Sequence, residues 1–189
     1  PPHPTIAYVS WSLICCVAFA FTGLLALTGC SRKSIDKGFS GEIAYDHIET
    51  LVGYGPREPE TKAIAKAQSY IETTLNGYGW KVSRQSFKDQ TPIGEKRFVN
   101  LRARFSPNFD DLDWKDGGGK LLICSHYDTK IIEGINFVGA NDGGSSTGVL
   151  IELARILSKD PERAKKIEFI FFDGEEAIVD FSATDGLYG

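Results

Sequence analysis

Two runs of apolar residues, each followed closely by acidic or histidine residues, stand out in the hydrophobic pattern of the chain. Residues 167–172 (Ile-Glu-Phe-Ile-Phe-Phe) predict a strand buried on both faces, and residues 173–176 (Asp-Gly-Glu-Glu) follow at once. Residues 121–124 predict a second buried strand, which leads to His126 and Asp128. Sites in α/β sheets form outside the carboxyl ends of strands, so we expect both polar clusters at one edge of a sheet.

The remaining periodicities predict helices and strands in alternation. Apolar residues spaced three and four apart predict a helix that opens at Pro59 and ends at Gly77. The same spacing over residues 149–157 predicts another helix. Residues 81–87 and 97–105 alternate between apolar and polar, as strands do. Together these elements are typical of an α/β sandwich.

A loop of small residues with a single carboxylate lies between the two predicted buried strands. Residues 139–148 read Gly-Ala-Asn-Asp-Gly-Gly-Ser-Ser-Thr-Gly, and the carboxylate is Asp142. Such a loop can be a plain turn or helix cap, and a phosphate loop would need a Gly-Lys-Ser/Thr sequence that is absent here. Histidine, aspartate and glutamate are, however, ligands of catalytic zinc, which keeps one position open for substrate.

The two adjacent glutamates, Glu175 and Glu176, fit a division of labour at such a site. Burying several carboxylates at a strand end is costly unless a cation or a catalytic role offsets it. Neighbouring side chains point in different directions, so one glutamate can bind a metal while the other transfers protons. The alternative is a strand that runs into a polar turn, with the glutamates in the first turn of a helix.

The series His-x-Asp, Gly-Ala-Asn-Asp and Gly-Glu-Glu resembles the zinc aminopeptidase clan, and within it the glutaminyl-peptide cyclotransferases of the animal type. Three segments favour the cyclotransferase branch: residues 90–101 (Gln-Thr-Pro-Ile-Gly-Glu-Lys-Arg-Phe-Val-Asn-Leu), residues 126–130 (His-Tyr-Asp-Thr-Lys), and residues 169–177 with 185–189. The resemblance covers residues 43–189. It implies a three-layer α/β/α sandwich with a mixed central sheet, incomplete at its carboxyl end.

The resemblance also implies roles for individual residues. Asp142 and Glu176 match zinc ligands, and Glu175 matches the catalytic acid and base. His126 matches a metal ligand of the two-zinc aminopeptidases, whereas in the cyclotransferases it lies near a single zinc and need not bind it. Gly143 stands where many aminopeptidases carry a second aspartate, which favours the cyclotransferase branch.

Substrate binding is assigned by the same resemblance to Lys130 and Phe181. Lys130 lies where the cyclotransferases carry a lysine, and Phe181 replaces a pocket tryptophan. The implied reaction converts the amino-terminal glutamine of peptides or proteins to pyroglutamate, with zinc as cofactor and ammonia as the second product. A zinc aminopeptidase and an inactive exported binding lipoprotein are the alternatives. The net charge of −4 gives no indication of nucleic-acid binding.

The first thirty residues predict export. Residues 13–27 are mostly apolar, and the sequence Leu-Thr-Gly-Cys that ends at Cys30 looks like a bacterial lipobox. We therefore divide the chain into a signal peptide (1–29), a lipidated tether (30–41) and the amino-terminal part of a cyclotransferase- or aminopeptidase-like domain (42–189). This predicts a protein lipid-anchored to a bacterial membrane and facing the periplasm or the exterior. The alternative is an uncleaved anchor that begins near Ile6.

We predict that Cys30 carries lipid after cleavage before it. Mass spectrometry of the amino-terminal peptide from membrane-extracted protein tests this prediction. An unmodified Cys30 that is still joined to Gly29 would contradict it.

Further expectations come from composition and length. Beyond the signal and Cys30, the only cysteine is Cys124, which we expect to be a buried packing residue with no disulfide partner. The acidic, glycine-rich residues 108–119 predict an exposed loop. The chain contains no methionine and stops soon after the motifs, so we expect a fragment that lacks on the order of a hundred residues. Asp142 and Glu176 are two ligands, whereas catalytic zinc normally takes three from the protein. We therefore expect such a fragment to be inactive and to bind zinc poorly.

Overall fold

The computed structural model describes residues 38–106 and 120–189, and in these residues a mixed sheet is covered by helices. The strands are β1 (Trp80–Thr91), β2 (Gly94–Phe105), β3 (Leu121–His126) and β4 (Ile167–Phe172), in the order β1-β2-β4-β3. The helical elements are α2 (Gly41–Gly53), α3 (Lys62–Gly77), η1 (Ala140–Ser145), α4 (Ser146–Leu157) and α5 (Pro161–Ala164). Neighbouring strands are antiparallel except β3 and β4, which are parallel. The expected α/β class and mixed sheet are confirmed.

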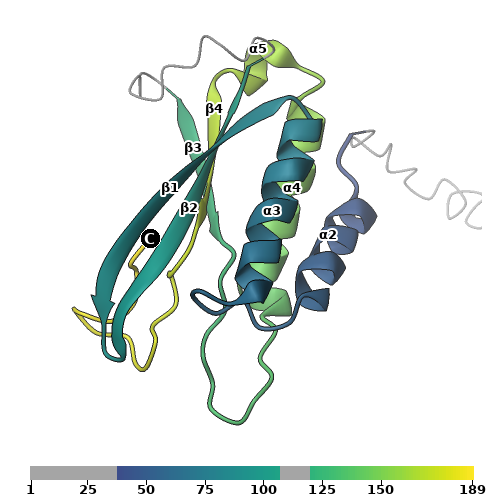
Figure 1. The fold of residues 1–189 in the computed structure, drawn as a ribbon. Helices are drawn as coiled ribbons and strands as arrows, with labels where there is room; N and C mark the ends of the chain where they lie inside the picture. Colours follow the sequence, from purple (N-terminus) through teal and green to yellow (C-terminus); the bar gives the residue numbers. More distant parts are fainter. Residues whose placement is uncertain (1–37, 107–119) are drawn as a thin grey trace, which may run out of the picture. The chain divides into compact units, whose positions relative to one another are not determined.

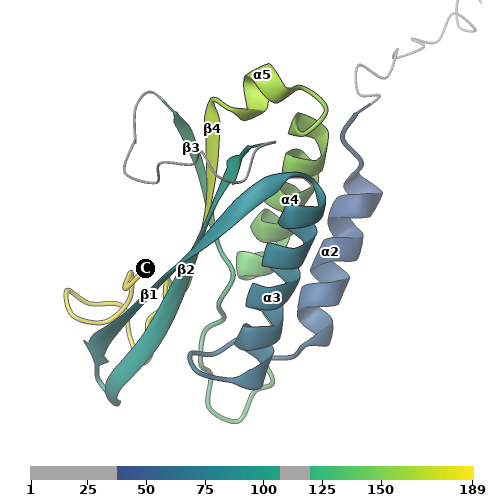
Figure 2. The ribbon, with the colours of Figure 1, turned by 45° about the horizontal axis from the view of Figure 1, so that its top comes forward.

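Helices α2, α3 and α4 lie on the same side of the sheet (Figures 1 and 2). The core forms between them and the inner face of the strands, where Trp80, Phe169 and Phe171 are fully buried. The Trp80 indole packs 4.7 Å from the Phe169 ring and donates its N–H to the carbonyl of Ala154 in α4 at 3.0 Å. This bond satisfies the one polar group that the indole brings into the core.

The helix boundaries differ from the sequence expectation at the amino-terminal side. Helix α3 ends at Gly77 as expected but begins at Lys62, three residues after Pro59, because the Thr61 side chain caps it by accepting from Ile64 N at 3.3 Å. Helix α2 was not predicted at all. Its cap is Ser40, and its inward positions include the polar residue His47, so its apolar stripe is weak in sequence.

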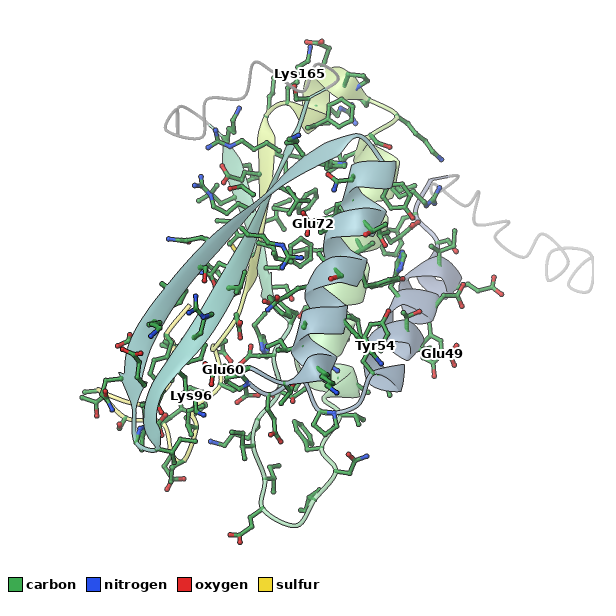
Figure 3. The ribbon with its side chains drawn as sticks, viewed as in Figure 1. Glu49, Tyr54, Glu60, Glu72, Lys96 and Lys165 are labelled. Atoms are coloured by element: carbon green, nitrogen blue, oxygen red, sulfur yellow. The ribbon has the colours of Figure 1, made fainter. Side chains whose placement is uncertain are left out.

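The strands are longer than the alternation predicts, and β1 and β2 form a hairpin with Thr91 paired to Gly94. An ion pair fixes this hairpin to the segment before α3: Lys96 Nζ lies 3.4 Å from Glu60, whose other oxygen accepts from Arg97 N (Figure 3). A second pair, between Arg84 in β1 and Glu72 in α3, joins the hairpin to that helix.

Strand β3 is an edge strand, which makes one expectation wrong. Leu121 and Leu122 are more than half exposed, and Cys124 is exposed as well, so Cys124 is not a buried packing residue. Cys124 pairs with Ile170 on the outer face of β4, whereas its neighbour Ile123 packs against the core. Within residues 38–106 and 120–189, no helix covers the side of the sheet away from α3 and α4 (Figure 1). A short apolar run predicts a strand, but whether a second layer covers that strand is a tertiary property.

The central strand β4 is confirmed, with a difference on its outer face. There Glu168 is buried between Arg102 and Arg104, with nitrogen-to-oxygen distances of 2.6 and 2.7 Å. Ile170 and Phe172 on the same face are partly exposed. The strand is therefore fully buried only toward the helices. Its outer face carries the ion-paired Glu168 and the two apolar residues Ile170 and Phe172.

The predicted signal, lipobox and anchor fall within residues 1–37, and the acidic loop falls within 107–119; both lie outside the described residues. Across residues 38–106 and 120–189, no helix has the length and apolar character needed to cross a membrane.

Candidate metal and catalytic site

The carboxyl ends of β3 and β4 bring the predicted site residues together. Because the parallel strands pair His126 with Phe172, the His-x-Asp segment and the Glu-Glu segment leave the sheet at the same level. His126 Nε2 lies 3.0 Å from Asp142 Oδ1, and His126 Nδ1 lies 3.9 Å from Glu175 Oε2. One ligand atom from each of His126, Asp142 and Glu176 lies within 4.8 Å of the other two. The expectation of one shared edge is confirmed.

Asp142 projects from the loop because the next residue, Gly143, adopts a left-handed backbone conformation that favours glycine. Gly143 has φ of 73°, and a Cβ on it would lie 2.9 Å from the carbonyl oxygen of Asp128 and 3.0 Å from the His126 ring. The loop then turns into α4, whose Thr147 hydroxyl donates to the His126 carbonyl at 2.8 Å. The glycines therefore let the loop pack against the histidine while Asp142 projects from it, with its side chain 59% exposed.

Asp128 orients two members of the site, a role that we had not assigned to it. It is 1% exposed; its Oδ1 lies 3.2 Å from His126 Nδ1, and its Oδ2 accepts from Glu176 N at 3.1 Å. A carboxylate on one imidazole nitrogen fixes the ring and leaves Nε2 for a metal. The His-x-Asp spacing carried this signal in the sequence.

Arg57 is a residue that sequence reasoning missed. Its guanidinium is fully buried and donates to four backbone carbonyls: Tyr127 at 2.7 Å, Val138 at 2.8 Å, Gly139 at 3.1 Å and Leu51 at 3.3 Å. Burial lowers the pKa of Arg57 to about 10, against the opposing effect of Asp128. The guanidinium ties both ends of the loop between β3 and η1 to α2. Nothing near it in sequence marks it as special.

The charges of the site favour a bound cation. Burial alone would lower the pKa of His126, but Asp128, Glu175 and Asp142 together raise it to about 9. Burial, and then the nearby Asp142 and Asp128, raise the pKa of Glu176. Carboxylates that raise one another's pKa in a confined space are stabilised when a divalent cation enters.

Asp173, the first acidic residue after β4, has a structural place. It is 1% exposed, its Oδ2 accepts from Val99 N at 2.8 Å, and its own N–H donates to Asn100 Oδ1 at 3.0 Å. Burial raises the pKa of Asp173 to about 7, although the bond from Val99 opposes this shift. Asp173 therefore fastens the end of β4 to β2.

Lys130 and Phe181, which the resemblance assigned to substrate binding, contact each other. Lys130 Nζ donates to the carbonyls of Ala177 at 2.6 Å and Val179 at 2.7 Å, and it lies 5.8 Å from the centre of the Phe181 ring. The ammonium is thus engaged by the loop that follows Glu176. The Phe181 ring is 59% exposed.

The donor set fits zinc. Catalytic zinc sites use three protein ligands drawn from histidine, aspartate and glutamate, and His126, Asp142 and Glu176 supply one each. Our expectation of poor zinc binding assumed that His126 does not reach the metal. His126 Nε2 lies 3.0 Å from Asp142 Oδ1, and the expectation of poor zinc binding stays a prediction.

Comparison with known proteins agrees with the motifs. Residues 112–189 match Peptidase family M28. The chain is 36% identical over 146 residues to a glutaminyl-peptide cyclotransferase of Dictyostelium discoideum, covering 70% of this chain and 41% of that protein. It is 32% identical over 139 residues to the glutaminyl-peptide cyclotransferase of Drosophila melanogaster, covering 71% of this chain and 37% of that protein.

Solved structures give the same result. The fold is similar to the glutaminyl cyclase of an Acidobacteriales bacterium (TM-score 0.68, 32% identity, 85% of this chain and 53% of that one). It is also similar to the glutaminyl cyclase of Porphyromonas gingivalis (TM-score 0.64, 30% identity, 82% of this chain and 49% of that one). A leucine aminopeptidase precursor of Bacteroides thetaiotaomicron matches with a TM-score of 0.62 and 26% identity, over 74% of this chain and 48% of that one. The resemblance to glutaminyl cyclases within an aminopeptidase-like clan is confirmed, and the chain spans about two fifths of the length of the curated relatives.

Proposed function

We propose that this chain carries the catalytic carboxylates of a zinc-dependent glutaminyl-peptide cyclotransferase, which forms pyroglutamate from amino-terminal glutamine and releases ammonia. The observation that carries the proposal is the placement of Glu175. Its carboxylate lies 3.9 Å from His126, one of the three candidate ligands, without being among them, and its side chain is 35% exposed. A general base must be open to substrate in this way.

Each protein group has a role in this reaction. His126, Asp142 and Glu176 would hold zinc, which supplies a Lewis acid for the carbonyl of the substrate's γ-carboxamide. Glu175 accepts a proton from the substrate's α-amine as its nitrogen bonds to the amide carbon. Glu175 then returns the proton to the departing nitrogen as the carbon–nitrogen bond breaks, which yields ammonia. Since the nucleophile belongs to the substrate, orientation supplies much of the rate.

An aminopeptidase is the competing function, and the similarity to a leucine aminopeptidase precursor favours it. The two are separated by assaying the protein, as its gene encodes it, with a glutamine-initiated peptide and with leucine anilide. Pyroglutamate and ammonia without anilide release support the cyclotransferase. Anilide release without pyroglutamate would refute it.

We predict that Asp142→Asn weakens zinc binding by more than about tenfold, because it removes a charged ligand. The exposure of Asp142 means that the fold should remain intact, so the loss reports on the metal alone. Zinc titration with a competing chelator measures it, and Asp46→Asn on the exposed side of α2 is the matched control. Equal affinities for the two variants would remove Asp142 from the ligand set.

A further inference from the structure

The segment after Glu176 is organised around a buried carboxylate that no part of the proposed mechanism uses. Asp185 is 3% exposed and accepts from three consecutive backbone amides, those of Ile178 at 2.7 Å, Val179 at 2.8 Å and Asp180 at 2.9 Å. The Tyr188 hydroxyl donates to it at 2.7 Å. Burial by itself would raise the pKa of Asp185, but these four bonds lower it to about 2. The side chain is therefore a fixed negative charge beneath the turn.

The opposite edge of the same turn is held by a positive charge. Lys130 Nζ, in the segment after His126, donates to the carbonyls of Ala177 and Val179. The amides of residues 178–180 thus meet a carboxylate, while carbonyls of the same turn meet an ammonium. Charge-assisted bonds of this kind are roughly twice as strong as neutral ones, so the turn is restrained from both edges.

The segment that follows Asp185 also bonds the main chain just before Glu176. Leu187 N donates to the Glu175 carbonyl at 3.0 Å, and Tyr188 N donates to the Gly174 carbonyl at 2.8 Å. The Tyr188 ring stacks on Phe98 of β2, with centroids 4.9 Å apart and planes 10° apart. Residues 174–188 are therefore a closed loop: its start lies on the sheet, its end lies beside its start, and Asp185 bonds its middle.

We propose that Asp185 is a positioning residue, assisted by Lys130, that fixes the main chain on either side of Glu175 and Glu176 and so sets their distance from His126 and Asp142. The proposal rests on the proposed function for the roles of the two glutamates. Its physical basis is that a metal ligand in a loop binds well only when the loop is already in the binding geometry. Lys130 then has its effect through this loop, without a contact to substrate.

Asp185→Asn is the test, because asparagine keeps the size but removes the charge and replaces one acceptor oxygen by a donor. Asp180→Asn is the matched control: it makes the same change in the same turn, at an exposed carboxylate. We expect Asp185→Asn to weaken zinc binding about tenfold and to lower kcat by a similar factor, with KM changed less than about twofold. Asp180→Asn should leave all three values unchanged.

Hydrogen exchange of the metal-free protein gives a readout independent of activity. Asp185→Asn should speed exchange in residues 174–188 and leave α3 and α4 at the wild-type rate, since the change is local. Tyr188→Phe removes one of the four bonds and should give a smaller effect in the same segment. It also serves as the test if Asp185→Asn does not fold.

The outcomes separate this inference from the proposed function. If the wild-type protein binds zinc but forms no pyroglutamate, the proposed function fails while the zinc and exchange measurements still decide the role of Asp185. Wild-type zinc affinity and wild-type exchange in Asp185→Asn would overturn the inference. Uniformly faster exchange over the whole domain, with unchanged zinc affinity, would likewise overturn it in favour of a purely structural role.

Discussion

Glu175→Gln is expected to lower the turnover of glutamine-initiated peptides by about 10²–10⁴-fold, the usual contribution of a general base, and to leave zinc binding nearly unchanged. Glutamine keeps the shape of the side chain but cannot accept the proton from the α-amine. Glu175 is not among the three candidate ligands, so the metal keeps its donors. Steady-state kinetics and metal analysis on the protein as its gene encodes it measure both effects.

The neighbouring residue supplies the matched variant. Glu176→Gln should weaken zinc binding, because it removes a charged ligand oxygen. The two variants make the same chemical change at adjacent positions, so a general effect of losing negative charge would appear in both. If Glu175→Gln lost zinc and Glu176→Gln kept it, the two roles would have to be exchanged.

Arg57→Met is expected to have the largest effect on stability, about 3–5 kcal/mol in the free energy of unfolding, as for the loss of one partner in a buried charged network. Methionine fills a similar volume but leaves the four carbonyls that Arg57 contacts without a donor. Two of these carbonyls, at Val138 and Gly139, lie at the start of the loop that carries Asp142. Zinc binding should therefore weaken even at temperatures where the variant is folded.

Urea unfolding of the wild type and the variant measures this prediction. Arg84→Met is the control: Arg84 pairs with Glu72 on the surface with 39% of its side chain exposed, and such pairs contribute about 0–1 kcal/mol. Equal destabilisation by the two variants would show that the buried guanidinium is not a special anchor. A destabilised Arg57→Met with wild-type zinc affinity would limit its role to the fold.

Local chemistry in the sequence was enough to identify the residues that meet at the site. Apolar runs and helical spacing reflect which side of an element is buried, and this repeats over a few residues. The segments that carry His126, Asp142, Glu175 and Glu176 each follow a predicted strand or precede a predicted helix. Given parallel strands, their meeting at one edge followed from the strand direction. Helix α2, which was not predicted, carries the polar residue His47 on its buried side, and this weakens the apolar periodicity.

The tertiary structure alone decided which residues hold that site in place. Arg57 bonds Tyr127 and Val138 at separations of 70 and 81 residues, and Lys130 bonds Ala177 at a separation of 47.

 No local pattern links residues so far apart, because the bonds form only once the sheet and helices have packed. The exposure of Cys124 was decided in the same way, by the position of β3 at the edge of the sheet. Residue type and spacing thus determined the chemistry available to this protein, while long-range packing determined its geometry, since a backbone carbonyl or amide becomes a partner only through the fold.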